Sequence, residues 1–260
     1  MRAEVRADRG EGPPILYIPG IDGTGELLLE TSTSLEERHR LVRMQYLAEP
    51  VSPSEFPRAD TYPGLAGSIA ARCAERRLHG ALAVAESFGG AVALQLALDN
   101  PGLIRGLMIV NSFARFPDRL RLAWALRLSP HLPRTAFDLG RRWLAPASLF
   151  GTLREPAAVA AFRALPGTFF DQAYGRRLRM IAGLDLLPRL SELRIPVALV
   201  AADRDRIVPS VPCAEEMAAH LPDVTLEVVP GGGHLILPLA AQPWQERLDA
   251  LAERAPVQAG

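Results

Sequence analysis

The stretch Gly80-Ala-Leu-Ala-Val-Ala-Glu-Ser-Phe-Gly-Gly-Ala-Val-Ala-Leu-Gln-Leu-Ala-Leu98 decides the fold of this chain. Its first six residues predict a buried strand, and the residues from Ala91 onward predict a helix. Ser87 occupies the turn between them, with a small residue two positions before it, Ala85, and another two positions after it, Gly89. A tight strand-to-helix turn needs small residues there, because larger side chains would collide, and it presents the serine oxygen clear of the backbone.

This turn leaves two interpretations of Ser87 open. A serine hydroxyl becomes a useful nucleophile only beside a base and near N–H groups that can hold an oxyanion. The usual pattern for such a turn is G-x-S-x-G, and here Ala85 replaces the first glycine. Serine is also favoured before a helix as a capping residue. The turn alone does not decide between a nucleophile and a cap.

Composition excludes several classes of function. With 260 residues, 48% of them hydrophobic, the chain can bury a substantial core, either as one α/β domain with an insertion or as two small domains. A net charge of zero argues against the basic surface of a nucleic-acid-binding protein. Every basic residue is arginine, so chemistries that need a lysine, such as Schiff-base or P-loop chemistry, are excluded.

Cysteine usage and the first residues indicate a cytoplasmic protein. Cys73 and Cys213 lie far apart, so neither a disulfide framework nor a metal knuckle is expected. The first eight residues alternate in charge and lack the apolar run of a signal peptide. The long apolar stretch 80–98 contains Glu86 at its middle, which favours a core segment over a membrane span. The remaining histidines share no spacing typical of metal ligands, so no metal and no cofactor are expected; they are His39, His79, His131 and His220.

Strands and helices alternate along most of the chain. Strands are expected at 2–8, 15–18, 40–46, 81–85, 106–110, 195–202 and 225–229, and helices at 25–38, 65–78, 91–98, 211–221 and 240–253, with a proline-rich loop at 49–63. The alternation stops at Asn111, and the pattern from 113 to 187 is helical and interrupted by prolines. We therefore expect a mainly parallel sheet covered on both faces, formed by 1–112 and 188–260, with a helical cap at 113–187.

Two later loops carry an acid and a histidine. Asp203 and Asp205 follow the strand at 195–202, and Pro230-Gly-Gly-Gly-His234 follows the strand at 225–229. A serine, an acid and a histidine, each just past the carboxyl end of a strand, follow the chain order of the α/β-hydrolase triad. Because these ends meet at one edge of a parallel sheet, the ordered set favours a catalytic Ser87 over a cap.

The chain resembles α/β-hydrolase-fold serine esterases and acyltransferases. The segments Pro19-Gly-Ile-Asp-Gly-Thr-Gly25 and Glu86-Ser-Phe-Gly-Gly90 are similar to the branch that contains phytyl ester synthases, diacylglycerol acyltransferase-like proteins and many bacterial esterases. The resemblance covers both core segments and less of the cap. It departs from the pattern at Ala85 and in the early first strand, which leaves room for one N-terminal antiparallel strand or none.

The resemblance implies a role for each site residue. Ser87 attacks an acyl carbonyl, His234 transfers the proton, and an acid orients the imidazole. In this family the acid usually lies four residues before a proline, so Pro209 selects Asp205, with Asp203 as the competitor. The oxyanion would be held by the backbone N–H groups of Ile21 and Phe88. The expected activity is cofactor-free hydrolysis of a carboxylic ester through an acyl-enzyme.

Four further residues are expected around the substrate. Asp22 should point away from the oxyanion and accept hydrogen bonds from loop N–H groups, as Asx residues do in turns. Glu86 should act beside the nucleophile and not in the chemistry itself. Trp124 of the cap and Leu235, which follows His234, complete the set. Apolar cap faces should cover the pocket above Ser87; these are Leu120, Trp124 and Leu128 on one helix, and Tyr174, Leu178 and Ile181 on another.

The cap is rich in arginine, with twelve arginines against five acids between 113 and 187. We expect these arginines to face outward as a solvated helix surface; the alternative is a patch that steers an anionic substrate, an acyl carrier or an anionic membrane surface. An acyl thioesterase or acyltransferase would use the same triad, and a binding protein with an idle triad is the alternative that Ala85 supports. Dehalogenase chemistry is disfavoured because it places Asp at the nucleophile position. The oligomeric state stays open.

Overall fold

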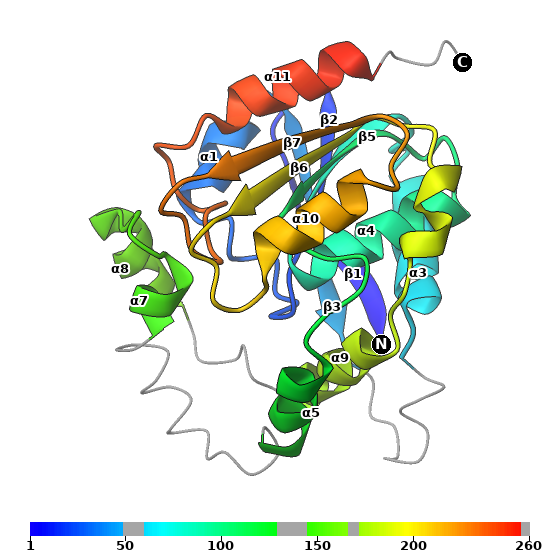
Figure 1. Cartoon of the computed structure of the whole chain (residues 1–260). Helices are drawn as coiled ribbons and strands as arrows, with labels where there is room; N and C mark the ends of the chain where they lie inside the picture. Colours follow the sequence, from blue (N-terminus) through cyan, green and yellow to red (C-terminus); the bar gives the residue numbers. More distant parts are fainter. Residues whose placement is uncertain (49–59, 129–144, 166–171, 256–260) are drawn as a thin grey trace.

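A seven-stranded sheet forms the centre of the molecule, and helices cover both of its faces (Figure 1). The computed structural model describes residues 1–48, 60–128, 145–165 and 172–255. The strand order is β1-β3-β2-β4-β5-β6-β7, where only β1 runs antiparallel to its neighbour. The predicted mainly parallel sheet with one N-terminal antiparallel strand is confirmed. The strands are β1 (Arg2–Arg9), β2 (Pro14–Ile18), β3 (Arg40–Leu47), β4 (Ala81–Glu86), β5 (Ile104–Val110), β6 (Val197–Ala202) and β7 (Val224–Val229).

Two hydrophobic clusters sandwich the sheet. One lies against α3 (Tyr62–Glu75), α4 (Phe88–Asp99) and α10 (Ser210–Ala218), and the other against α1 (Glu30–Glu36) and α11 (Trp244–Arg254). Strand β4 alternates between them. Its three alanines face the α4 side, and Leu82 and Val84 face the α11 side. Because both faces are covered, the strand is apolar from Ala81 to Ala85, and its alanines leave room for the fully buried start of α4.

Two predicted helices have different bounds in the structure. The helix expected at 25–38 is only α1, Glu30–Glu36, because Gly23, Gly25 and Leu29 all have positive φ angles that hold the preceding segment in turns. The helix expected at 65–78 begins earlier, where the Thr61 hydroxyl accepts a hydrogen bond from the Gly64 amide. That helix ends at Glu75, before the predicted end. Most of the predicted 49–63 loop lies outside the described residues.

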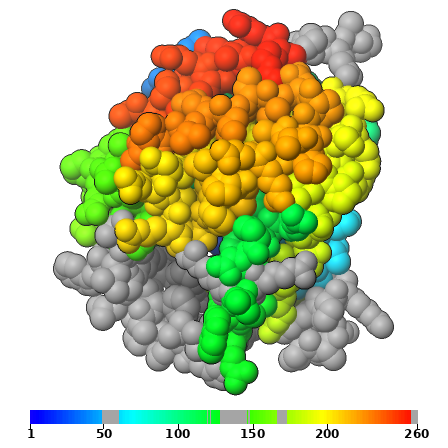
Figure 2. All heavy atoms as spheres, in the orientation of Figure 1, coloured from blue at the N-terminus to red at the C-terminus, as the bar shows by residue number. Residues whose placement is uncertain are grey.

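The insertion between β5 and β6 is helical, and its described part contains no strand. It comprises α5 (Arg119–Leu128), α7 (Ala145–Leu149), α8 (Pro156–Ala164), α9 (Gln172–Ala182) and the 3₁₀ helix η3 (Leu187–Glu192). Helices α7 and α8 lie near the carboxyl ends of β6 and β7, whereas α5 and α9 lie together at another part of the molecule (Figure 1). The space-filling view shows α5 projecting from the body (Figure 2). Within the described ranges, no helix has the length and apolar character needed to cross a bilayer.

Candidate active site

Ser87 directly follows β4 and has an unusual backbone conformation. Its φ of 51° and ψ of −126° lie in a sparsely populated region that costs free energy for any residue with a Cβ atom. It occupies the capping position of α4, but its side chain makes no capping hydrogen bond. Instead its Oγ lies 3.0 Å from Nε2 of His234. The turn thus directs the hydroxyl toward the imidazole and away from the helix.

Close packing explains why glycines follow Ser87. A Cβ atom on Gly89 would lie 2.3 Å from the carbonyl oxygen of Pro19, and one on Gly90 would lie 2.3 Å from Oγ of Ser112. The Ser112 hydroxyl donates a hydrogen bond to the carbonyl of Ser87, at 2.6 Å. Ala85, at the other side of the turn, is fully buried in the α4-side cluster. The start of α4 can therefore approach β2 and β5 only because these residues are small.

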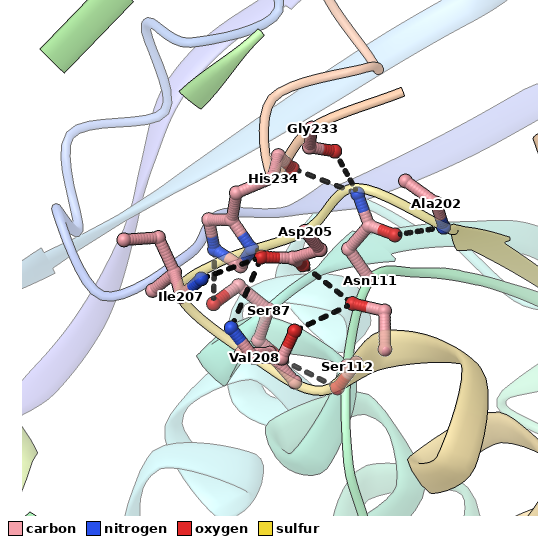
Figure 3. A network of polar contacts seen from close by, with 10 residues as sticks. Ser87, Asn111, Ser112, Ala202, Asp205, Ile207, Val208, Gly233 and His234 are labelled. Atoms are coloured by element: carbon pink, nitrogen blue, oxygen red, sulfur yellow. Dashed lines mark hydrogen bonds and ion pairs between the residues drawn. The ribbon is translucent and has the colours of Figure 1, made fainter. Parts of the chain in front are cut away.

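The imidazole of His234 is held by a buried carboxylate (Figure 3). Its Nδ1 lies 2.7 Å from Oδ2 of Asp205, and Ser210 donates its hydroxyl to the same oxygen. The other carboxylate oxygen accepts hydrogen bonds from the amides of Ile207 and Val208, at 2.8 and 3.0 Å. With both oxygens engaged, the carboxylate has a fixed orientation, which in turn fixes the orientation of the imidazole.

The charges of this pair support each other. Burial of the Asp205 carboxyl favours its neutral form, but the neighbouring His234 and the hydrogen bonds to it lower its pKa below the ordinary value. Burial of the imidazole disfavours its cation, but the Asp205 carboxylate outweighs this effect and raises the pKa of His234 above 6.5. This arrangement stabilises the imidazolium that forms when a base takes a proton from a serine.

Asp203, the competitor for the acid role, lies elsewhere. Its side chain is exposed, and Oδ1 accepts a hydrogen bond from the amide of Gly231, at 2.7 Å. Asp203 thus supports the loop before His234, and the structure places Asp205, not Asp203, against the imidazole.

Asn111 was missed by sequence reasoning, although it holds the histidine loop. It follows β5 with a φ of 48° and is 1% exposed. Its Nδ2 donates to the carbonyls of Gly233 and His234, both at 2.9 Å, and its Oδ1 accepts from the amide of Ala202, at 2.8 Å (Figure 3). An asparagine directly after a buried strand was the available signal, because asparagine tolerates positive φ.

The loop after β2 lies beside Ser87 and forms a turn. The position of a Cβ on Gly20 would be 3.6 Å from Cβ of Ser87, and the Gly23 amide donates to the Gly20 carbonyl at 3.1 Å. Among the described residues, no hydrogen bond has the amide of Ile21 or of Phe88 as its donor. The two N–H groups predicted to hold an oxyanion therefore belong to segments that meet at Ser87. Neither N–H group donates a hydrogen bond to another described residue.

Asp22 forms the expected Asx turn, and its orientation away from the oxyanion stays a prediction. Its Oδ2 accepts hydrogen bonds from the amide and hydroxyl of Thr24, at 2.8 and 2.6 Å. Its Oδ1 is buried without a hydrogen-bond partner and would lie 3.4 Å from a Cβ on Gly20. Burial raises the pKa of the Asp22 carboxyl, while the Thr24 hydrogen bonds and the charge of Arg177 oppose that shift.

Glu86 is buried next to the nucleophile, at 3% exposure. The hydroxyl of Tyr17 donates a hydrogen bond to Oε1 of Glu86, at 2.5 Å. Burial raises the pKa of Glu86 to about 7; the Tyr17 hydrogen bond opposes this shift, and the negative charge of Asp22 adds to it. A carboxyl group that titrates near neutral pH thus precedes Ser87 in the chain.

The remaining predicted substrate contacts occupy very different environments. Leu235 is 5% exposed and belongs to the cluster on the α11 side of the sheet, whereas Trp124 of α5 is 61% exposed. Leu120, on the same helix, is 77% exposed, and the side chain of Leu128 lies outside the description. On α9, Leu178 and Ile181 are buried in the α4-side cluster, with Tyr174 packed against it. Contact of Trp124 or Leu235 with a substrate stays a prediction.

The expectation that the cap arginines face outward is wrong for two of them. Arg176 and Arg177 of α9 are only 5% and 1% exposed. Arg176 forms a salt bridge with the buried carboxylate of Asp60. Arg177 donates from Nε to the carbonyl oxygen of Ile21, at 2.6 Å. These two arginines of α9 thus pack against the core, whereas Arg179 is exposed as expected. Arg134, Arg141 and Arg142 lie outside the described residues.

No group of three or more histidine, cysteine, aspartate or glutamate side chains in the described part of the chain could hold a metal ion. What the site does contain is a hydroxyl, an imidazole and a carboxylate in one hydrogen-bonded chain, next to two amides without a described acceptor. This arrangement can activate a serine toward a carbonyl carbon.

Comparison with known proteins places the chain among hydrolases. A family model described as "Alpha/beta hydrolase family" matches residues 18–250. A putative carbamate hydrolase, RutD of Escherichia coli O103:H2, is 29% identical over 241 residues, which cover 86% of this chain and 85% of the relative. The predicted α/β-hydrolase fold is confirmed.

Solved structures with a similar fold belong to proteins named for different activities. An esterase from Thermogutta terrifontis superposes with a TM-score of 0.76 at 20% identity, covering 98% of this chain and 94% of its own. A putative non-heme bromoperoxidase, BpoC of Mycobacterium tuberculosis H37Rv, has a TM-score of 0.72 at 21% identity, with coverages of 96% and 93%. At these identities the likeness shows the fold alone.

Proposed function

Because the chain belongs to the alpha/beta hydrolase family, we propose that it is a serine hydrolase that cleaves a carboxylic ester through an acyl-enzyme. The observation that carries this proposal is the continuous chain from Ser87 Oγ to His234 to Asp205, with separations of 3.0 and 2.7 Å. These are the distances over which a proton can pass between heavy atoms.

In the proposed first step, the Ser87 oxygen attacks the ester carbonyl carbon while Nε2 of His234 takes the hydroxyl proton. The carbonyl oxygen becomes an oxyanion that the amides of Ile21 and Phe88 stabilise, an effect worth about 100- to 1000-fold in rate for one donor. The imidazolium, stabilised by Asp205, then gives its proton to the departing alcohol. The products of this half-reaction are a free alcohol and an ester between the acyl group and Ser87.

In the second step water replaces the alcohol. His234 takes a proton from the water as its oxygen attacks the acyl-enzyme, and a second oxyanion forms at the same amides. Collapse breaks the bond to Ser87, which recovers its proton from the imidazolium, and releases a carboxylic acid. An alcohol that attacked in place of water would make the chain an acyltransferase, as in the branch that its sequence resembles.

A carbamate is a second candidate substrate, favoured by the 29% identity with a putative carbamate hydrolase over most of both chains. A carbamate presents a carbonyl carbon to the same nucleophile, so the triad alone does not distinguish it from an ester. The distinction depends on the groups that contact the rest of the substrate, and we therefore include carbamates in the test.

The test begins with a fluorophosphonate probe, which forms a covalent bond to an activated serine. We expect wild-type protein to be labelled and the Ser87→Ala variant not to be labelled. Turnover of p-nitrophenyl esters of graded acyl length, acyl thioesters and carbamates, with and without added alcohol, then identifies the preferred substrate class. Absence of labelling, or labelling that persists in Ser87→Ala, would contradict the proposal.

A further inference from the structure

Arg177 is a buried arginine that touches the loop after β2. The guanidinium comes from α9 of the insertion, and its side chain is 1% exposed. Nε donates to the carbonyl oxygen of Ile21, at 2.6 Å, and Nη2 donates to the carbonyl oxygen of Asp22, at 3.2 Å. Burying a guanidinium is costly unless its N–H groups are satisfied, so these two contacts anchor both partners.

The two contacted carbonyls directly follow, along the chain, the Ile21 amide that would bind the oxyanion. The N–H and the carbonyl of Ile21 belong to two consecutive peptide planes. Fixing the plane that contains the carbonyl limits rotation of the plane that contains the N–H. Gly23 lets the loop approach the guanidinium, since a Cβ there would lie 3.1 Å from Nη1 of Arg177 and 3.0 Å from Cδ2 of Tyr46. The positive φ of Gly23, 71°, also suits glycine.

Tyr46 of β3 holds the same loop from the core. Its hydroxyl donates to the carbonyl of Pro19, at 3.0 Å, and its amide donates to the carbonyl of Gly23, at 2.7 Å. These contacts secure the two ends of the turn and leave its middle, Ile21 and Asp22, to Arg177. The middle of the turn is therefore held by a side chain from the insertion.

The charge of Arg177 has a second effect. The buried Asp22 carboxyl lies beside Gly20, the residue that also approaches Ser87, and a negative charge on this loop would oppose an oxyanion. Arg177 brings a positive charge to the same loop. Replacing this arginine would thus remove the clamp on the two carbonyls and leave the acidic group without that compensation.

We propose that Arg177 is a positioning residue that orients the Ile21 amide toward the oxyanion by clamping the carbonyls of Ile21 and Asp22. The inference rests on the proposed function, because the orientation matters only if an oxyanion forms at Ser87. It predicts a loss in transition-state stabilisation that exceeds any loss in ground-state substrate binding.

The experiment compares Arg177→Met with Arg176→Met, its matched control. Both substitutions remove a buried guanidinium from adjacent positions of α9, but the described contact of Arg176 is with Asp60, whereas the described contacts of Arg177 are with the loop. For each protein we would measure the melting temperature, kcat and KM for one ester. We would also measure the inhibition constants of a trifluoromethyl ketone, which forms an oxyanion on the serine, and of the matching methyl ketone.

For Arg177→Met we expect kcat to fall about 100-fold with KM changed less than threefold, and the preference for the trifluoromethyl ketone over the methyl ketone to fall in parallel. Arg176→Met should lower the melting temperature yet keep that preference within about twofold of wild type. Unchanged kcat and inhibitor preference in folded Arg177→Met, or an equal fall in Arg176→Met, would overturn the inference.

Arg177→Lys keeps the test decisive if Arg177→Met does not fold. A lysine ammonium keeps the charge but cannot reproduce the planar, two-nitrogen contact with both carbonyls. We expect about a tenfold fall in kcat and in the preference for the trifluoromethyl ketone. Wild-type values of kcat and of this preference would contradict the proposed role of Arg177. Failure of wild-type protein to react with the fluorophosphonate would instead contradict the proposed function, so the two failures are distinguishable.

Discussion

The turn that carries Ser87 and the loop that carries His234 are built differently. The serine turn depends on the close approach of small residues, because a Cβ on Gly89 or Gly90 would collide with neighbouring strand ends. The histidine loop depends on polar contacts from distant segments. Asn111 holds its carbonyls, Asp203 holds the Gly231 amide, and Leu149 of the insertion accepts a hydrogen bond from the Leu235 amide.

The two halves of the site should therefore respond to different kinds of substitution. The serine half should be sensitive to added volume and tolerant of lost polar groups that are not part of the reaction. The histidine half should be sensitive to lost hydrogen bonds. Substitutions of Asp205, Ala85, Glu86 and Asn111 test this contrast.

The largest effect is expected at the acid of the histidine half. Asp205→Asn should reduce kcat about 1,000- to 10,000-fold, because the imidazole loses the carboxylate that fixes its tautomer and stabilises its cation. Asp203→Asn, which alters only the support of the Gly231 amide, should stay within about tenfold of wild type. Steady-state kinetics on one ester measures both variants, and the reverse order of effects would overturn the assignment of the acid.

Added volume should be nearly as damaging in the serine half. Ala85→Val places two more methyl groups in a fully buried position beside the turn, and overpacking of this kind costs about 1–3 kcal/mol in stability. We expect kcat/KM to fall by about 100-fold, whereas Ala85→Gly should stay within a few-fold. Kinetics and thermal unfolding check both; a stable, fully active valine variant would show that close packing does not shape this turn.

Glu86→Gln tests a polar group of the serine half through stability. The folded-state pKa of about 7 exceeds the ordinary 4.5, so the folded protein binds the proton more tightly and loses stability as pH rises from about 4.5 to about 7. A glutamine side chain does not titrate, so it adds no pH dependence to the stability. Relative to wild type, the variant should gain about 2–3 kcal/mol in free energy of unfolding between pH 4.5 and pH 8.

Urea unfolding at the two pH values measures this gain. The titrating groups that Glu86 does not influence are common to both proteins, so their contributions cancel in the difference. A difference that does not grow with pH would mean that Glu86 is ionised at little cost in the folded protein.

The smallest effect is expected at Asn111, in the histidine half. Asn111→Gly keeps the positive φ without strain but removes all three side-chain hydrogen bonds to the histidine loop and β6. We expect kcat/KM to fall about tenfold through less favourable placement of His234. Asn111→Asp keeps the acceptor for the Ala202 amide but replaces the side-chain donor with a second acceptor. Its kcat/KM should therefore fall at least as far as that of Asn111→Gly. Wild-type kinetics in both variants would show that the loop does not need this support.

The same difference explains what the sequence could predict. The serine turn was predictable because its determinants, an apolar strand, small residues and a following helix, lie within twenty residues of each other. Asp205 was preferred over Asp203 from the position of Pro209 in the resembling family, and it is Asp205 that contacts His234. The sheet was predictable for the same reason, because each strand is marked by an apolar run within a few consecutive residues.

Contacts across long separations could not be predicted in this way. Asn111 joins segments about a hundred residues apart, and its polar character alone does not reveal its partners. The outward orientation expected for Arg177 was wrong because helical periodicity cannot tell a solvated polar face from one that meets peptide carbonyls in the core. The short α1 differs from the longer predicted helix because tertiary contacts hold the turns at Gly23 and Gly25.

The helical insertion meets the site at two separate places. The carbonyl of Leu149, at the end of α7, accepts a hydrogen bond from the Leu235 amide next to the histidine. Helix α9 contacts the loop after β2 through Arg177. An engineer who wished to change substrate range by transplanting a relative's insertion would therefore also replace two supports of the reaction centre. If the proposed roles hold, such a chimera would keep its rate only where the donor segment supplied an equivalent carbonyl and an equivalent guanidinium.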